Sequence, residues 1–261
     1  MNDIRETPEN ARPPRVVFIG LASCFGCQIN ITNIEAHLLE VLGQIDLGYW
    51  QLTSSKPMPE EFDVAVIEGA VTTAEAEATV REAREKAKTV ITIGACANTA
   101  GIPGMASVDF PAQLAVVYGD AAPDACGTLQ APVPVKDVIA VDFEVPCCPI
   151  DPYEFVRVLD SALYGSNYLP ATSALCGECS RNERGCLYAQ GQMCLGLVTR
   201  SGCGAKCPAL GRACNGCAGL SPDANVASAR YFAGKKGIDP ERFDEALGMF
   251  NTVSLTAEGK E

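Results

Sequence analysis

The stretch RVVFIGLA at residues 15–22 decides the fold class of this chain. It is an almost unbroken apolar run, which is typical of a strand buried on both faces of a parallel sheet. A helix is expected next, because four apolar residues recur on one helical face. These residues are Ile31, Ile34, Leu38 and Leu42. A strand, a loop and a helix therefore open the chain.

The same alternation of strand and helix continues to about Gly165. Further strands are expected at 45–52, 63–68, 89–94 and 138–145. Further helices are expected from about residue 73, at 110–118 and at 151–164. Alternation of this kind predicts an α/β fold with a doubly wound parallel sheet.

Cysteines follow three of the expected strands. They are Cys24 and Cys27, Cys96, and the adjacent pair Cys147 and Cys148. In an open parallel sheet, ligands bind beyond the carboxyl ends of the strands. The sequence therefore predicts one four-thiolate site, built from the first three cysteines and one of the adjacent pair. Pro149 supports this, because ferredoxin-type sites also end in Cys-Pro. Cys126 is left over and is expected to be a buried or loop thiol.

Residues 176–217 hold eight of the fourteen cysteines. The apolar residues of this segment show no sustained helical or strand period, and its eight glycines loosen the backbone. Ligation of metal by thiolates would fix its shape instead. The cysteines divide into two sets, each with one C-x-x-C pair: Cys176, Cys179, Cys186 and Cys194, and then Cys203, Cys207, Cys214 and Cys217.

Three kinds of cross-link could use these eight thiols. Disulfides are expected in exported proteins, and residues 1–15 contain no apolar run of the kind found in secretory signals. Structural zinc and iron-sulfur clusters both use sets of four cysteines. The spacing within this segment leaves the choice between these two metals open.

The composition bounds the possible partners. A chain of 261 residues with 48% hydrophobic content can bury one large core and carry a second, smaller unit. No apolar stretch reaches the roughly eighteen residues of a membrane span, so we expect a cytoplasmic protein. The net charge of -12, without any basic cluster, argues against nucleic acid or anionic membrane as a partner. Residues 1–14 are expected to form a mobile arm.

Several motifs together resemble the small, electron-transferring subunit of nickel-iron hydrogenases. They are LASCFGCQINI (21–31), IEGAV (67–71), GACA (94–97), VYGD (117–120), the Cys148-Pro149 pair, CGEC (176–179), CLGLVTRSGCGAKCP (194–208) and CNGC (214–217). The resemblance implies a flavodoxin-like domain at 15–165, whose proximal 4Fe-4S cluster lies beside the nickel-iron centre of a separate large subunit. It also implies a small, irregular, iron-sulfur-rich C-terminal domain at 166–261 with medial and distal 4Fe-4S clusters.

The resemblance carries twelve cluster ligands over to this chain. Cys148 is preferred to Cys147 because the family motif places its ligand immediately before proline. The proximal set is then Cys24, Cys27, Cys96 and Cys148. The medial set is Cys203, Cys207, Cys214 and Cys217, and the distal set is Cys176, Cys179, Cys186 and Cys194.

Two positions separate this chain from the membrane-linked uptake enzymes of the family. Those enzymes have a histidine where Cys176 stands, and near Cys207 a proline that leaves the medial cluster as 3Fe-4S. Cysteine at both positions implies three 4Fe-4S clusters and the cytoplasmic branch, especially sulfhydrogenases and their NAD(P)-linked bidirectional relatives. The viologen-reducing and deazaflavin-reducing hydrogenases of methanogens are a somewhat less similar alternative.

The resemblance implies an electron relay. The C-x-x-C pairs of the chain are all allotted, so none is left to hold nickel, and the chain should not split dihydrogen alone. It would pass electrons between the nickel-iron centre of the large subunit and a flavin or iron-sulfur subunit linked to NAD(P). Glu68 matches a family carboxylate near the subunit interface, although an ordinary surface carboxylate is an equally good interpretation.

Three other functions remain to be separated from this one. The proximal-cluster subunit of respiratory complex I has a similar fold, but it has adjacent cysteines where this chain has Cys24-Phe25-Gly26-Cys27, and it lacks the C-terminal eight. A stand-alone ferredoxin-like carrier would usually be shorter. A zinc-stabilised interaction protein is the third alternative, which metal analysis would distinguish.

Overall fold

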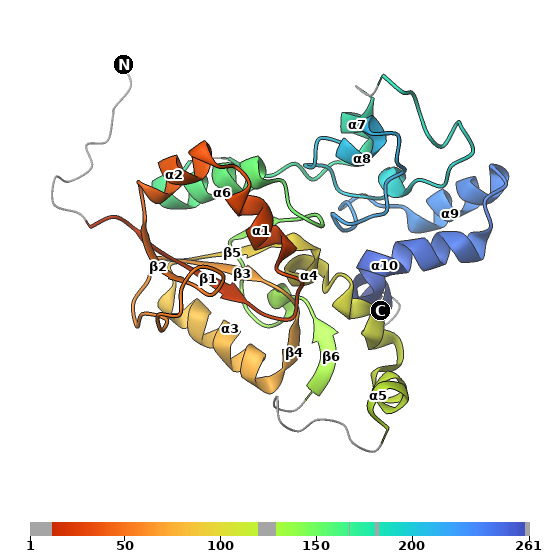
Figure 1. The fold of residues 1–261 in the computed structure, drawn as a ribbon. Coiled ribbons are helices and arrows are strands. Elements are labelled where there is room, and N and C mark those ends of the chain that lie inside the picture. The colour runs from red at the N-terminus through yellow and green to blue at the C-terminus, as the bar shows by residue number, and fades with distance from the viewer. Residues whose placement is uncertain (1–11, 120–128, 167, 181–182, 259–261) are drawn as a thin grey trace.

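A computed structural model describes residues 12–119, 129–166, 168–180 and 183–258. Cys126 and most of the expected N-terminal arm lie outside these residues. Figure 1 shows a sheet flanked by helices, with the cysteine-rich segment and the C-terminal helices beside it.

The main sheet has five strands, all parallel, in the order β2-β1-β3-β5-β7. Counted along this sheet alone, the order is 2-1-3-4-5, which is the flavodoxin-like, doubly wound arrangement. The predicted fold class is therefore confirmed. The strands are β1 (Arg15–Gly20), β2 (Asp46–Trp50), β3 (Val64–Glu68), β5 (Thr89–Ile93) and β7 (Phe143–Val145).

Both faces of this sheet are buried. Alternate residues of each strand point to opposite faces, and helices cover both faces. Val16 and Phe18 pack under α1 (Gly26–Thr32), α2 (Ala36–Leu42) and α6 (Pro152–Tyr164). Val17 and Ile19 pack against α3 (Ala74–Lys86) and α4 (Gly94–Thr99) on the other face. This two-sided burial explains why the strand at 15–22 is almost wholly apolar.

Local structure departs from the sequence prediction at several places. The helix expected across Ile31 to Leu42 is two helices, α1 and α2, because Glu35 between them has a φ of 45° and cannot continue either one. The last strand is shorter than expected, because the N–H groups of Val138 and Ile139 both donate to the carbonyl of Val135 and fold this segment into a turn. An unpredicted two-stranded antiparallel sheet joins β4 (Val71–Thr73) to β6 (Leu129–Val133).

The C-terminal region is irregular only in its first part. Short turns of helix there are α7 (Cys176–Cys179), η3 (Leu195–Leu197) and α8 (Lys206–Ala209). Two longer helices follow, α9 (Val226–Lys235) and α10 (Pro240–Glu258), which share a core that includes Phe243 and Leu247.

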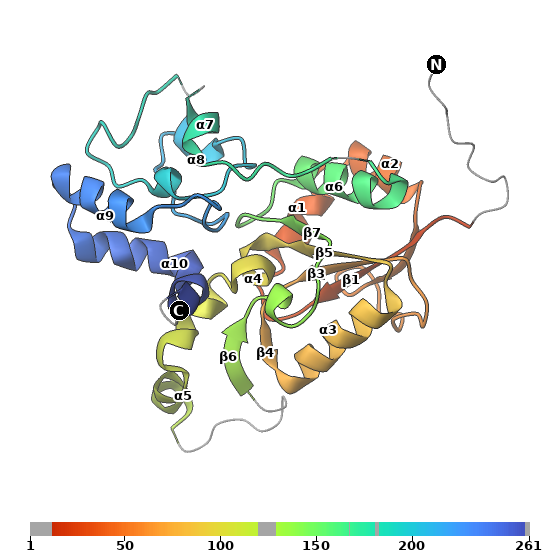
Figure 2. The ribbon, with the colours of Figure 1, turned by 180° about the vertical axis from the view of Figure 1, so that it is seen from behind.

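Helix α10 also packs back on the sheet domain. It lies against α4 and against η1 (Pro103–Asp109), which leads into α5 (Phe110–Tyr118). Figure 2 shows α10 directly beside α4. A Cβ at Gly104 would lie 3.2 Å from Val253 Cγ2, so the two parts approach closely. The division into two domains near Gly165, where α6 ends, stays a prediction.

Candidate functional site

The first group of thiols lies where β1, β5 and β7 end. Cys24 and Cys27 follow β1, Cys96 lies in α4 directly after β5, and Cys148 follows β7. Burial raises the pKa of Cys27, and the Glu68 carboxylate and the thiols of Cys148 and Cys96 raise it further. Burial also raises the pKa of Cys96 to about 11, with contributions from Cys148 and Cys24. The structure thus brings together four predicted site residues from distant segments.

Two features hold Cys27 in this group. Glu68 ends β3 and is 2% exposed; its Oε1 accepts the backbone N–H of Cys27 and its Oε2 that of Gln28, both at 3.2 Å. Gly94 has a φ of 83°, and a Cβ there would lie only 2.5 Å from Cys27 Sγ. Glu68 is therefore a buried positioning group, so its interpretation as a surface carboxylate is wrong. Gly94 leaves the space that the Cys27 thiol occupies.

The two adjacent cysteines differ in exposure. Cys148 is exposed and interacts with Cys217 and Cys24, whereas Cys147 is 5% exposed and interacts with Cys203 and Cys217. Interaction among these three thiols raises the pKa of Cys147 and lowers the pKa values of Cys203 and Cys217. The ligand role of Cys148 stays a prediction.

The second group contains Cys203, Cys207, Cys214 and Cys217. Burial raises the pKa of Cys207, and the thiols of Cys217 and Cys203 raise it further. Burial raises the pKa of Cys214 to about 12, although the backbone N–H of Gly216 donates to its Sγ at 3.4 Å. The predicted medial set is thus gathered in one place.

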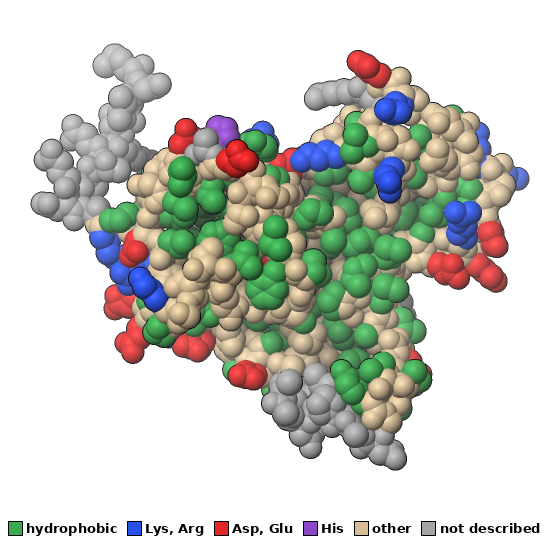
Figure 3. All heavy atoms as spheres, in the orientation of Figure 1, with side chains coloured by type: hydrophobic (Ala, Val, Ile, Leu, Met, Phe, Trp, Pro, Cys, Tyr) green, Lys and Arg blue, Asp and Glu red, His purple; other side chains and the backbone are tan. Residues whose placement is uncertain are grey.

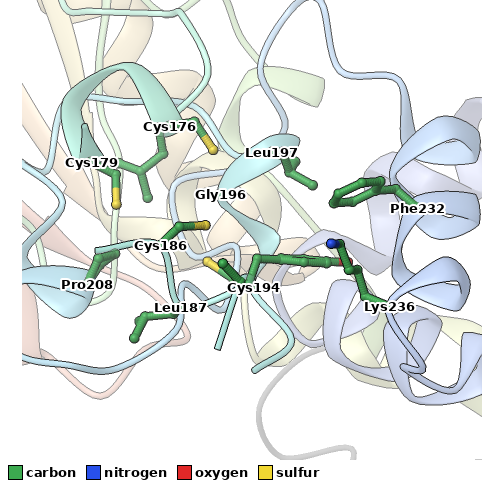
Figure 4. A pocket seen from close by; sticks show the side chains of 13 residues that line it. Cys176, Cys179, Cys186, Leu187, Cys194, Gly196, Leu197, Pro208, Phe232 and Lys236 are labelled. Atoms are coloured by element: carbon green, nitrogen blue, oxygen red, sulfur yellow. The ribbon is translucent and has the colours of Figure 1, made fainter. Parts of the chain in front are cut away.

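The third group lines a cavity of about 290 Å³. Figure 4 shows Cys176, Cys179, Cys186 and Cys194 around this space. Burial raises the pKa of Cys176, with contributions from the other three thiols. The backbone N–H of Cys214 donates to Cys194 Sγ at 3.3 Å, so the second and third groups touch.

The buried hydroxyl group of Tyr188 shows how well the cavity suits an iron-sulfur cluster. It lines the cavity and is 5% exposed, and its hydroxyl has no hydrogen-bond partner among the described residues. Burial raises its pKa and the nearby Cys194 raises it further. A buried hydroxyl without an acceptor costs about 1–3 kcal/mol, which a cluster sulfur would recover. Thiolates are the ligands that such clusters use, so the residues present fit the group.

In the part of the chain that the structure describes, no three His, Cys, Asp or Glu side chains form a group that could hold a metal ion. A cluster holds its thiolates farther apart than one ion would, because each thiolate binds a different iron. Over the same residues, no helix combines the length and apolar character of a membrane span.

Known proteins resemble this chain in sequence and in fold. A family model described as NADH ubiquinone oxidoreductase, 20 Kd subunit, matches residues 24–162. A subunit of the F420-non-reducing hydrogenase vhu of Methanocaldococcus jannaschii is 32% identical, over 92% of this chain and 94% of the relative. The sulfhydrogenase 2 subunit delta of Pyrococcus furiosus is 35% identical, over 79% of this chain and 86% of the relative. The chain belongs to the small-subunit family of nickel-iron hydrogenases.

Solved hydrogenase structures agree with this membership. One, titled an NAD+-reducing [NiFe]-hydrogenase in the H2-reduced state, matches with a TM-score of 0.56 and 27% identity, over 61% of this small subunit and 96% of that chain. A [NiFeSe]-hydrogenase of Dm. baculatum shares the fold with a TM-score of 0.59 at 18% identity, over 82% of this chain and 97% of that one. Since the relatives are hydrogenase subunits, the interpretations as a stand-alone carrier or a zinc-stabilised interaction protein are set aside.

Proposed function

We propose that this small subunit carries three 4Fe-4S clusters and passes single electrons between the nickel-iron centre of a large subunit and a flavin or iron-sulfur subunit linked to NAD(P). The proximal ligands are Cys24, Cys27, Cys96 and Cys148. The medial ligands are Cys203, Cys207, Cys214 and Cys217, and the distal ligands are Cys176, Cys179, Cys186 and Cys194.

The observation that carries this proposal is that the three groups of thiols adjoin one another in series. Cys148 interacts electrostatically with Cys217 as well as with Cys24, which links the first group to the second. The backbone N–H of Cys214 donates to Cys194 Sγ, which joins the second group to the third. Clusters held by these thiols would be neighbours in the order proximal, medial, distal. Such a row favours conduction of electrons over a purely structural role for the metal.

The surface around the first group suits a large partner. Ile29 lies two residues after Cys27 and is 47% exposed, and Ile102 and Met105 are 46% and 47% exposed. Figure 3 shows hydrophobic side chains gathered over the middle of this face. Contiguous exposed apolar surface marks interaction sites. A large subunit that covers these residues would place its own metal centre beside the proximal group.

One observation supports a second candidate for the type of hydrogenase and hence for the electron acceptor. The NAD-reducing hydrogenase HoxS subunit delta of Cupriavidus necator is 30% identical over only 60% of this chain and 83% of the relative. The relative from Methanocaldococcus jannaschii matches 92% of this chain. This difference in coverage favours a small subunit of the methanogen type as the second candidate. Purification of the whole complex would identify the acceptor subunit directly, and fractionation would test the predicted cytoplasmic location.

Metal analysis tests the cluster count. We expect the complex purified without oxygen to hold about twelve iron and twelve sulfide per small subunit, beyond the iron of the large subunit, and no zinc bound to this chain. Zinc with only one or two clusters would contradict the proposal.

Electron spin resonance tests the cluster type. With cysteine at both Cys176 and Cys207, the oxidised complex should give no 3Fe-4S signal, and reduction should bring up interacting spin-half signals. A strong 3Fe-4S signal in a freshly oxidised, undamaged sample would refute the assignment of Cys207.

A further inference from the structure

Positive charge is concentrated in the part of the chain that surrounds the third group of thiols. Residues 166–236 carry eight Lys and Arg and three Asp and Glu, a net charge of +5, whereas the whole chain has a net charge of -12. Figure 3 shows Lys and Arg side chains spread over the lobe that α7, α8 and α9 form. The rest of the chain is strongly acidic, so this lobe is the part of the molecule that attracts an anionic surface.

Basic and apolar side chains lie together on one wall of the cavity. Figure 4 shows Phe232 and Lys236 of α9 on one side of the four cysteines and Pro208 on the other. Lys236 Nζ lies 5.5 Å from the centroid of the Phe232 ring, and Lys235 Nζ lies 5.2 Å from that of Tyr231, which is 68% exposed. Neither lysine forms an ion pair with a described residue. Their charges are therefore available to a partner.

The opposite wall repeats this combination. Arg184 is exposed, and its Nε donates to the carbonyl of Ala209 at 3.0 Å, which fixes the guanidinium beside α8. Leu210 directly follows α8 and is 75% exposed. Each wall thus presents positive charge beside an exposed apolar side chain. We call this surface the rim of the cavity, and it consists of Arg184, Leu210, Tyr231, Phe232, Lys235 and Lys236.

The thiols between the two walls are accessible from outside. Cys176 and Cys186 are exposed, and neither Cys179 nor Cys194 is buried. The first and second groups differ, because they include the buried thiols of Cys27 and Cys214. A redox protein must come close to a cluster to exchange electrons with it. A protein seated on the rim would lie directly over the third group.

We propose that the rim docks an acidic surface of the electron-acceptor subunit, so that electrons pass between the two proteins at the third group. This rests on the proposed function, which makes the third group the distal cluster. Exposed aromatic residues and arginine are typical of protein interfaces. Complementary charges speed association and fix the orientation of the partner. Since the rim surrounds thiols, an electron carrier fits it better than an anionic membrane does.

Cross-linking with a carbodiimide tests this docking directly, because the reagent joins an ammonium group to a carboxylate only where the two are in contact. It is added to cell extract without oxygen and at low salt, and the complex is recovered through a tag on the large subunit. We expect mass spectrometry to find Lys235 or Lys236 joined to Asp or Glu of a flavin or iron-sulfur subunit.

Two matched charge reversals test the electrostatic part. Lys236→Glu reverses a charge on the rim, whereas Arg242→Glu reverses an exposed charge on α10 that does not line the cavity. At low salt, Lys236→Glu should bind the acceptor subunit several-fold more weakly than the parent does. The difference should largely disappear near 1 M salt, where the screening length is about 3 Å. Arg242→Glu should bind like the parent, and both variants should keep the parent's iron content.

Cross-links from the two lysines only to the large subunit or to a second copy of this chain would overturn the proposal, as would the absence of any cross-link. Equal weakening by Lys236→Glu and Arg242→Glu would overturn it as well. Binding of the parent complex to phosphatidylserine vesicles, abolished by Lys236→Glu, would assign the rim to a membrane instead. Failure of the proposed function is visible separately, since metal analysis of the parent would then show no third cluster, whatever the lysines contact.

Discussion

Replacing Gly94 by alanine should remove the proximal cluster rather than merely weaken the fold. A Cβ at this position would lie 2.5 Å from Cys27 Sγ, whereas non-bonded carbon atoms pack best at about 3.5–4.0 Å. The sulfur must therefore move by about 1 Å or more. Metal ligands in a well-formed site keep their distances to within about 0.2 Å. The displaced Cys27 should no longer bind iron.

The backbone contribution can be measured with a matched control. Gly94 has a φ of 83°, and alanine in such a conformation costs about 1–3 kcal/mol. Gly165 has a φ of 66°, but a Cβ there would meet no heavy atom within 4 Å. Gly165→Ala thus reports the backbone cost without a clash.

The assay compares the two variants in the complex with the large subunit, purified without oxygen. We expect Gly165→Ala to keep about twelve iron per small subunit and to lose only stability, while Gly94→Ala loses about four iron as well. The reasoning fails if Gly94→Ala keeps all its iron and melts no lower than Gly165→Ala.

Four substitutions address single groups. Cys148→Ala should lose about four iron, whereas Cys147→Ala should lose none; the opposite result in iron analysis would exchange their roles. Glu68→Gln should destabilise the complex by about 1–3 kcal/mol in denaturant titrations, because an amide offers one acceptor where the carboxylate serves two N–H groups. Tyr188→Phe should lower the distal cluster's potential by on the order of tens of millivolts in a redox titration, since one hydrogen-bond donor is lost; an unchanged potential would show that the hydroxyl does not reach the cluster.

The sequence was sufficient to predict the sheet and where its cysteines lie. Buried parallel strands are apolar on both faces, so β1, β3 and β5 could be identified from short runs alone. The topology rule for such sheets then placed Cys96 near Cys24. Neither step depends on contacts between side chains, which is why both could be made without a structure.

Other features are harder to predict from the sequence. The break at Glu35 follows from a local φ that no spacing rule predicts. Helix α10 could have been found, because Phe243, Leu247 and Phe250 are buried and recur at helical spacing. The positive φ of Cys147 could not, because no spacing rule predicts it. Tyr188 carried no signal beyond its position between two cysteines.

Removing the iron should unfold the cysteine-rich segment and leave the sheet folded. The sheet has large apolar cores on both faces, whereas the core at Leu175, Ala205 and Cys214 is small and packs mostly against other cysteines. Burial raises the pKa of Cys214 to about 12, so without metal this thiol keeps its proton and forms no ion pair that would hold the segment together. Ligation must release its proton, which couples iron binding to folding of residues 176–217. Hydrogen exchange on chelator-treated complex should show loss of protection there while β1, β3 and β5 stay protected. Retained protection across 176–217 after iron removal would show that apolar packing, not thiolate ligation, holds this segment.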